Sequence, residues 1–381
     1  MENEVYITGG LRSFIGLKDK SYKNIPAENL GAAVLKSLNE KYLKSGVNPE
    51  LVIAGNCVAC NGNIARLALL KAGMTSKIPG ITIDAQCASG LESIITGFAR
   101  IKSALNSVVV AGGTESASTQ AQRSWNKNHP NYDSNKDNSY KSAQFVPNFI
   151  NDDSMIYGAD ETCFVNNISI KEMIPFVLES HRRAAEAASR GLLDKITLKV
   201  FDLEKDESIR PSINENIIQR LPPLRNGGII NAATSCLMHD GAAFVTLCTK
   251  ENAEKLKAND DSFFRIVDAV TVGADGKRSP EGFILAIDTI LNKTGLSEKD
   301  IDRIDYNEAF ACIDVLYSHK YSKPSNCFGG ALAYGHPFGA TGAMLLLHLM
   351  TAMELNQEKL GIVAVPAAGG IASAILVERI K

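Results

Sequence analysis

Cys87 is the residue of this sequence best suited to nucleophilic chemistry. It follows an apolar strand-like run at 81–83 and precedes a small Ala-Ser-Gly turn at 88–90 and an apolar helical stretch. This order places the sulfur near a helix N-terminus, where unpaired N–H groups and the helix dipole favour thiolate over thiol. We therefore expect a lowered pKa and an activated nucleophile. A buried structural cysteine fits the same spacing equally well.

His336 lies in a glycine-rich segment, residues 329–342, which reads Gly-Gly-Ala-Leu-Ala-Tyr-Gly-His-Pro-Phe-Gly-Ala-Thr-Gly. So much glycine suits a tight loop whose backbone approaches a ligand closely. The segment lacks a Gly-Lys-Ser/Thr ending, so it is not a phosphate-binding P-loop. A lone histidine is usually structural, but a histidine in such a loop, in a chain with a candidate nucleophile, favours a catalytic role.

Asn307 opens the sequence Asn-Glu-Ala-Phe-Ala, directly after a strand-like run at 301–306. This position is the carboxyl end of a strand, where α/β proteins gather their sites. Taken alone, the motif could equally be a helix N-terminus, with Asn307 as the cap and Glu308 in the first turn.

These residues are set among alternating strand-like and helix-like segments, which predict a layered α/β fold. Residues 118–143 are crowded with Asn, Ser, Lys, Asp and Gln, which is typical of a surface excursion, and a helical segment at 169–189 follows within it. A strand at 242–248 returns the chain to the main body, and the alternation resumes from Phe264. The early segments are 4–8, 27–44, 51–55, 64–72, 81–85, 91–103 and 107–111.

An internal repeat indicates two homologous halves. In the first copy, the turn at 87–90 opens an apolar helix that leads to a strand ending in Gly112-Gly113. In the second, a turn at 339–342 opens an apolar helix and a strand leading to Gly369-Gly370. Gly339 stands where the first copy has the cysteine, so a single half carries this nucleophile.

Composition excludes several classes of function. The chain has 381 residues, of which 45% are hydrophobic and 22% charged, as expected for a folded protein of two domains or two fused halves. A formal net charge of -2 gives no field that would attract nucleic acid, so an anionic ligand must meet a local basic cluster. The start resembles no secretion signal, and the apolar run at 344–350 is too short to span a bilayer. We expect a cytoplasmic protein that binds no membrane.

Eight scattered cysteines fit reduced thiols better than a disulfide framework. Cys57 and Cys60 form one C-x-x-C without a second pair or a histidine at metal spacing, so we interpret them as structural thiols and expect no metal site.

Taken together, four ordered motifs resemble the thiolases over nearly the whole chain. They are Asp-Ala-Gln-Cys-Ala-Ser-Gly at 84–90, Val-Ala-Gly-Gly-Thr-Glu-Ser at 110–116, Asn-Glu-Ala-Phe-Ala at 307–311 and the glycine-rich segment at 329–342. The resemblance implies a thiolase fold of two βαβαβαββ halves in an αβαβα arrangement with an inserted loop domain. It assigns residues 1–117 with 240–262 to the N-terminal half, 118–239 to the coenzyme A-binding loop domain and 263–381 to the C-terminal half.

The same resemblance implies a homodimer or homotetramer that handles acyl-CoA substrates, with no permanently bound cofactor. Cys87 would take the acyl group, His336 its proton, and Asn307 would hold a water beside the substrate oxygen. The backbone N–H of Cys87 would form part of an oxyanion hole. Ala368, Gly369 and Gly335 would support these loops, and the coenzyme A contacts would be Arg210, Cys236, Met155 and Phe310.

Pro366 marks the main departure from the family. Thiolases usually carry a second cysteine here, in a Cys-x-Gly-Gly-Gly context, which moves the α-proton of the second acyl-CoA. This chain reads Val-Pro-Ala-Ala-Gly-Gly-Ile-Ala at 365–372, and proline has no ionisable group. Because general acid–base catalysis contributes about 10²–10⁴-fold, Claisen chemistry should be slow unless another group substitutes. Cys312 and His336 are the candidates. Ala368 replaces a glycine, Cys236 a pantetheine-contacting serine and Ser154 a histidine.

Three functional hypotheses follow. The first is a thiolase acting on short or medium 3-ketoacyl-CoA, with acetoacetyl-CoA as the default substrate. The second is a condensing or transacylating enzyme that uses Cys87 without abstracting an α-proton. The third is a catalytically silent thiolase-fold subunit that binds acyl-CoA or a partner protein.

Overall fold

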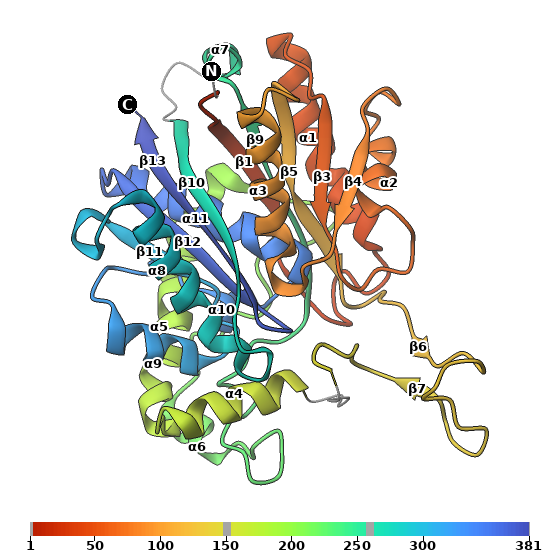
Figure 1. The fold of residues 1–381 in the computed structure, drawn as a ribbon, viewed down its shortest axis with the longest axis vertical. Coiled ribbons are helices and arrows are strands. Elements are labelled where there is room, and N and C mark those ends of the chain that lie inside the picture. Colours follow the sequence, from red (N-terminus) through yellow and green to blue (C-terminus); the bar gives the residue numbers. More distant parts are fainter. Residues whose placement is uncertain (1–2, 148–153, 257–262, 381) are drawn as a thin grey trace.

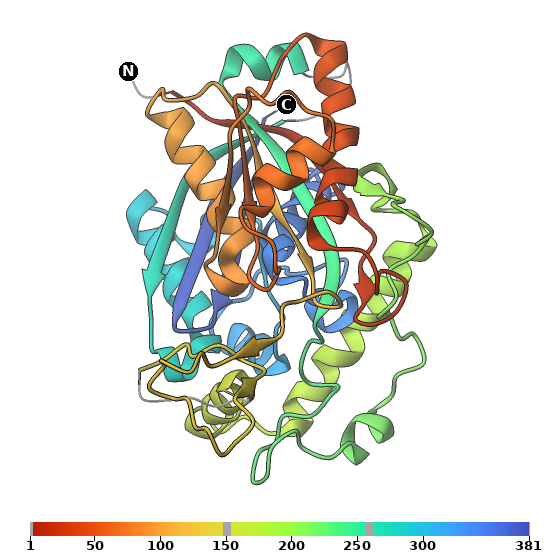
Figure 2. The same cartoon turned by 90° about the vertical axis from the view of Figure 1, so that its right-hand side faces the viewer.

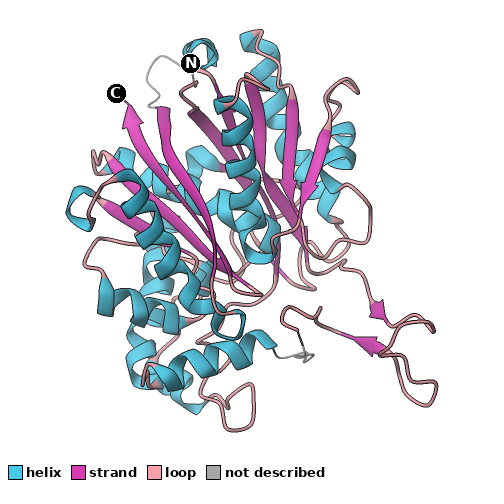
Figure 3. Ribbon diagram, in the orientation of Figure 1, coloured by secondary structure: helices cyan, strands magenta, loops and turns pink. Residues whose placement is uncertain are grey.

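The first half of the chain alternates strands and helices and ends in an antiparallel pair. The computed structural model describes residues 3–147, 154–256 and 263–380. Strands β3, β4 and β5 run parallel, and β9 and β1 complete this half in antiparallel steps (Figures 1 and 3). Its elements are β1 (Tyr6–Ser13), β2 (Gly16–Leu17), α1 (Ala27–Ser45), β3 (Leu51–Gly55), α2 (Ile64–Lys71), β4 (Gly80–Ile83), α3 (Ser89–Lys102), β5 (Val108–Ser116) and β9 (His239–Cys248), followed by α7 (Lys250–Leu256).

The second half repeats this plan with one strand fewer. Strand β12 runs parallel to β11 and antiparallel to β13, which pairs along its length with β10. Between α9 and α11 the chain forms a loop and a short helix where the first half has β4. The elements are β10 (Phe263–Gly273), α8 (Gly282–Thr294), β11 (Arg303–Tyr306), α9 (Ala311–Lys320), α10 (Ala331–Tyr334), α11 (Phe338–Leu355), β12 (Leu360–Ala367) and β13 (Ile371–Ile380).

The strands of the two halves form one continuous sheet. Tyr6 and Ile7 of β1 pair with Arg265 and Phe264 of β10, which gives the order β11-β12-β13-β10-β1-β9-β5-β3-β4. The predicted αβαβα arrangement is confirmed, because α1 and α2 cover one outer face, α8 and α9 the other, and α3 and α11 fill the space between the two parts of the sheet.

Helix α11 is apolar on all sides because it is buried on all sides. By length and composition it could cross a membrane, but 78% of its residues are buried inside the molecule, where it packs on α3, β5, β9 and β12. Its N-terminus meets the first half at unusually short range, since a Cβ atom on Gly113 would lie 1.8 Å from the Gly339 carbonyl oxygen. Only glycine permits this approach.

The segment between β5 and β9 lies to one end of the sheet. It begins as a polar arm with a two-stranded hairpin that reaches away from the body, and continues into helices packed beneath the second half (Figures 1 and 2). In the arm, Trp125 stacks between His129 and Tyr140. The elements are β6 (Arg123–Ser124), β7 (Ser139–Tyr140), α4 (Ser154–Val165), α5 (Ile170–Ser189), β8 (Thr197–Leu198) and α6 (Glu215–Arg220). Helix α5 begins with a capping box formed by Ser169 and Glu172.

Candidate active site

Cys87 stands in a strained turn between β4 and α3. Gln86 before it has a left-handed backbone with φ of 53°, a conformation that costs free energy for a residue with a side chain. Hydrogen bonds hold the turn: Ser89 Oγ donates to the Gln86 carbonyl at 2.7 Å and accepts the Ala85 N–H at 2.8 Å. Cys57 Sγ also donates to the Gln86 carbonyl at 3.2 Å. The nucleophile is thus fixed on a braced turn.

The expectation of a lowered pKa for Cys87 is wrong for this structure. Burial raises the pKa of the thiol to about 12, although the backbone N–H groups of Ala368 and of Cys87 itself act in the opposite direction. The side chain is 8% exposed, so the cost of desolvating a thiolate outweighs the helix N-terminus. Cys87 rests as a thiol and needs a base to become a nucleophile.

His336 is arranged to be that base. Thr341 Oγ1 donates its proton to the Pro337 carbonyl at 3.0 Å and therefore accepts the hydrogen of His336 Nδ1 at 2.7 Å. Nε2 is therefore the acceptor of the ring, and it faces the Asn307 amide group. Burial, with a smaller effect of the nearby His239, lowers the pKa of His336 to about 3, so the ring is neutral at physiological pH.

Asn307 lies beside this imidazole. Its Nδ2 is 3.3 Å from His336 Nε2, and its own N–H donates to the Ala364 carbonyl at 3.1 Å. Asn307 Oδ1 is a buried acceptor without a hydrogen-bond partner among the described residues, which is where a bound donor would be satisfied. The alternative interpretation as a helix cap is wrong, because α9 begins at Ala311 with Phe310 as its N-cap.

A buried carboxylate ties the two catalytic loops together. Glu115, at the end of β5, accepts the N–H groups of Cys57 at 3.0 Å and of Gly339 at 3.1 Å, and the amide of Asn56 at 2.8 Å. One side chain thus links the turn that braces Cys87 to the first turn of α11, which follows His336.

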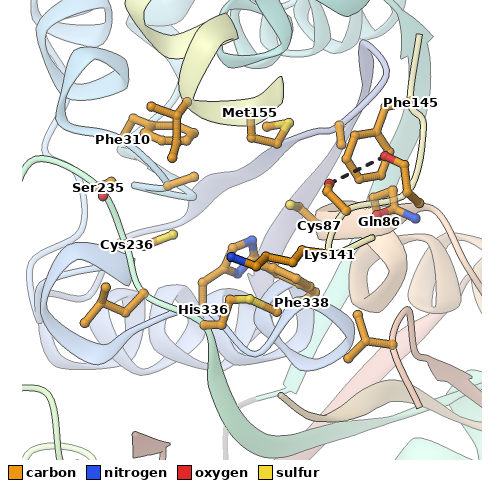
Figure 4. Close-up of a pocket in the computed structure, with 18 of the residues that line it drawn as sticks. Gln86, Cys87, Lys141, Phe145, Met155, Ser235, Cys236, Phe310, His336 and Phe338 are labelled. Atoms are coloured by element: carbon orange, nitrogen blue, oxygen red, sulfur yellow. Dashed lines mark hydrogen bonds between the residues drawn. The ribbon is translucent and has the colours of Figure 1, made fainter. Parts of the chain in front are cut away.

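Cys87 and His336 face one cavity of about 420 Å³ between the body and the loop domain. Figure 4 shows the sulfur of Cys87 and the ring of His336 directed into this space, with Cys236, Met155 and Phe310 on the facing walls. Its lining is mostly apolar, and the other residues are Val58, Gln86, Gln120, Arg123, Lys141, Ser142, Ala143, Phe145, Ile156, Leu224, Ser235, Leu237, Met238, Ala309, Phe338 and Ala368.

The three predicted supporting residues shape the loops around the cavity. Ala368 and Gly369 lie in the tight turn between β12 and β13, where Gly369 has φ of +82°, and the N–H of Ala368 is directed at Cys87 Sγ. Gly335 has φ of +89°, and a Cβ atom there would lie 2.0 Å from Nδ1 of His239. Glycine at 335 therefore lets the His336 loop pack directly on that ring.

Arg210 lies outside the main cavity. It lines a small polar pocket together with His181, Ser208 and His239, which adjoins the main cavity through the shared residues Ser235 and Leu237. The structure does not test whether Arg210 contacts coenzyme A, which stays a prediction.

Pro366 adjoins a small, largely apolar space next to Cys87, bounded also by Ile313 and Pro280. The hydroxyl of Ser279, which also borders it, donates to the Gly276 carbonyl at 3.0 Å and accepts the Gly370 N–H at 3.2 Å. Cys312 does not line this space or the main cavity and is fully buried on α9. Its proposed role as the substitute base is therefore wrong.

Sequence reasoning missed the contribution of the polar arm. Arg123 and Lys141 both line the cavity and place positive charge there, in a chain whose formal net charge is -2. The signal was present in the polar composition of residues 118–143, which includes both cations, but a surface excursion does not reveal which side chains turn inward. Thr341 and Glu115 were also missed, although both lie inside motifs already recognised.

A thiol and a neutral imidazole beside backbone N–H donors, held between two halves of a duplicated α/β fold, define a cysteine-dependent acyl-transfer site. Comparison with known proteins agrees. Residues 5–251 match the family model "Thiolase, N-terminal domain", and residues 261–379 match "Thiolase, C-terminal domain".

Relatives match over their full length. The protein named "Putative acetyl-CoA C-acetyltransferase VraB" of Staphylococcus aureus (strain MSSA476) is 33% identical over 99% of this chain and 100% of its own. The protein of the same name from Staphylococcus haemolyticus (strain JCSC1435) is 32% identical, over 99% of each chain.

Solved structures share the fold. The acetyl-CoA acetyltransferase of Bacillus anthracis superposes with a TM-score of 0.88 at 28% identity, over 100% of this chain and 99% of its own. Human mitochondrial 3-ketoacyl-CoA thiolase does so with a TM-score of 0.89 at 24% identity, with the same coverage. The chain belongs to the thiolase family and is a thiolase-type acyltransferase.

Proposed function

We propose that this protein is an acetyl-CoA C-acetyltransferase or short-chain 3-ketoacyl-CoA thiolase that works through an acyl thioester on Cys87. The observation that supports this most strongly is the placement of Cys87, a neutral His336 and the Ala368 N–H around one cavity. The names of the relatives and of the Bacillus anthracis structure point to the same reaction.

In this reaction, His336 Nε2 takes the Cys87 proton as the sulfur attacks the acyl carbonyl carbon. The N–H groups of Cys87 and Ala368 are directed at the sulfur, and we propose that they also receive the oxygen of an attacked carbonyl as it develops charge. Thr341 holds the imidazole in the tautomer that this step requires. Asn307, whose Nδ2 lies 3.3 Å from His336 Nε2, would hold a water beside the substrate oxygen.

Coenzyme A thioesters are the proposed substrates, and the reaction needs no resident cofactor because the thioester is already activated. Arg123 and Lys141 at the cavity would meet the phosphates, and the apolar walls near Met155 and Phe310 would cover the pantetheine and acyl groups. We further propose a role in lipid metabolism, a cytoplasmic location and a homodimer or homotetramer.

A transacylating or decarboxylative condensing activity is a second candidate. The residues around Pro366 favour it, because the small space there offers no base beside Cys87. Acyl transfer to and from Cys87, and condensation driven by loss of CO₂, both proceed without an α-proton base.

Thiolysis of acetoacetyl-CoA distinguishes the thiolase activity from the second candidate function. Purified protein mixed with acetoacetyl-CoA and coenzyme A should lose the ketoacyl absorbance faster than a Cys87→Ala control. If absorbance persists while labelled acetyl groups exchange between thioesters, the second function is correct. Absence of both reactions, with no acetylation of Cys87, would support a catalytically silent subunit.

A further inference from the structure

The proposed thiolase reaction needs a group in the cavity that can transfer the α-proton of acetyl-CoA. Cleavage of a 3-ketoacyl-CoA requires a proton for the α-carbon of the departing acetyl-CoA, and condensation requires its removal. On the Pro366 side of Cys87 the walls are apolar, and the Ser279 hydroxyl is engaged on both sides by backbone groups. The group that moves this proton must come from another wall.

The opposite wall carries a second thiol. Cys236 N–H donates to the Ala309 carbonyl at 2.9 Å, and its neighbours form bridges to both catalytic loops, Ser235 with Phe310 and Met238 with His336. The backbone of Cys236 is thereby fixed between these loops. Figure 4 shows its sulfur directed into the cavity toward His336, facing the sulfur of Cys87 from the other side.

Few other groups in the cavity could exchange a proton. Among the described residues that line it, none is an aspartate, glutamate or tyrosine. His336 already accepts the proton of Cys87 in the proposed reaction. Arg123 and Lys141 come from the polar arm and lie where an anionic substrate needs them. Cys236 is the remaining ionisable group, and it is partly exposed to the cavity.

We infer that Cys236 is a catalytic residue of the proposed thiolase reaction, and that it transfers the α-proton that a cysteine at position 366 would otherwise carry. This inference rests on the proposed function. Burial raises the pKa of Cys236, and the nearby Cys87 raises it further, so the resting group is a thiol with a proton to give.

The proton balance closes over a full cycle of cleavage. Cys87 gives its proton to His336 and its sulfur bonds to the 3-keto carbon. The C2–C3 bond breaks, and its electron pair takes the proton from Cys236, which releases acetyl-CoA and leaves a thiolate at 236. The His336 imidazolium returns its proton to the Cys236 thiolate. Coenzyme A then attacks the acyl group on Cys87 and gives its thiol proton to His336. The departing Cys87 sulfur recovers its proton from His336.

Hydrogen exchange at the α-carbon tests this step separately from acyl transfer. Acetyl-CoA is incubated with the full-length protein in D₂O, and deuterium in the acetyl methyl group is followed by NMR while Cys87 acetylation is followed by mass spectrometry. We expect Cys236→Ser, which keeps size and polarity, to lower α-exchange and thiolysis by about 10²–10⁴-fold. Cys87 should still become acetylated, because Cys236 takes no part in that half-reaction.

Two further variants sharpen the test. In Cys236→Ser/Pro366→Cys a thiol stands on the Pro366 side of Cys87, so α-exchange should recover. Cys60→Ser is the matched control, because Cys60 is an exposed thiol outside the cavity, and its α-exchange should match the wild-type rate.

The outcomes are distinct. Absence of Cys87 acetylation in the wild-type protein would overturn the proposed function itself. Acetylation with wild-type α-exchange in Cys236→Ser would overturn the role of Cys236 alone. Acetylation without α-exchange in the wild-type protein would also overturn it and would favour the second candidate function. An equal loss of α-exchange in Cys60→Ser would show that the loss is not specific to the cavity thiol, and would also overturn the role of Cys236.

Discussion

Two copies of one turn, helix and strand meet at the centre of the molecule, and they are used differently. In the first copy the turn before α3 carries Cys87. In the second, the corresponding position is Gly339 in the first turn of α11, whose backbone packs against Gly113 at a distance that admits no side chain. The chemistry of the second copy comes instead from His336, in the loop just before this turn. Duplication of the fold thus preserved the packing while the catalytic residues diverged.

The ends of the copies differ as well. The first strand, β5, ends in Glu115, which binds backbone N–H groups from both halves. The second strand, β12, carries Pro366 next to its last residue and leads into a turn that directs the Ala368 N–H at the Cys87 sulfur. One strand end therefore joins the two halves, whereas the other completes the site.

The largest loss of activity should follow substitution of His336, the base that the second copy contributes. His336→Gln keeps a polar side chain but cannot accept the Cys87 proton, so the rate of Cys87 acetylation by acetyl-CoA should fall by about 10²–10⁴-fold. Quenched-flow mass spectrometry measures this rate. A variant that acetylates as fast as the wild-type protein would show that another group activates the thiol.

The close contact between the two copies can be tested at Gly113, which does not line the cavity. Gly113→Ala places a methyl group against the Gly339 carbonyl, and overpacking of this kind costs about 1–3 kcal/mol. Gly62→Ala is the matched control, because nothing lies within 4 Å of its Cβ position. Denaturant unfolding should show reduced stability for Gly113→Ala only. Equal stability of the two variants would refute the close approach.

Orientation of the imidazole depends on Thr341. Thr341→Val removes the hydroxyl that accepts the Nδ1 hydrogen, and loss of one such hydrogen bond, about 0.5–1.5 kcal/mol, should slow acetylation roughly 2- to 10-fold. Thr341→Ser retains the hydroxyl and should react at nearly the wild-type rate. If serine were as slow as valine, the methyl group rather than the hydrogen bond would matter.

The smallest expected effect is that of pH on acetylation. His336 has its pKa lowered to about 3 and Cys87 has its pKa raised to about 12, so neither changes charge near neutrality. Acetylation should be nearly constant from about pH 5 to 9 and fall only as His336 protonates in more acidic solution. Alkylation of the free thiol by iodoacetamide, without help from the base, should rise about tenfold per pH unit. A bell-shaped acetylation profile centred near pH 7 would contradict these environments.

The repeat, the layered arrangement and the three residues Cys87, Asn307 and His336 could be predicted from sequence, because each lies in a local motif at the end of a strand or helix. The continuity of the sheet through β1 and β10 could not, since it depends on pairing between segments about 260 positions apart. The direction of the Cys87 pKa shift could not be predicted from sequence either. It is set by burial, and the cavity that Cys87 faces is walled by Phe145, Met155 and Phe310, which come from three separate parts of the chain.

Peptide mapping after incubation with acetyl-CoA tests the central claim most directly. Protein treated with the thioester, digested under acidic conditions and analysed by mass spectrometry should carry one acetyl group on the peptide containing Cys87, and that peptide should be unmodified in His336→Gln at early times. Acetyl groups found only on other residues, or none on Cys87 at saturating acetyl-CoA, would contradict the account of this site.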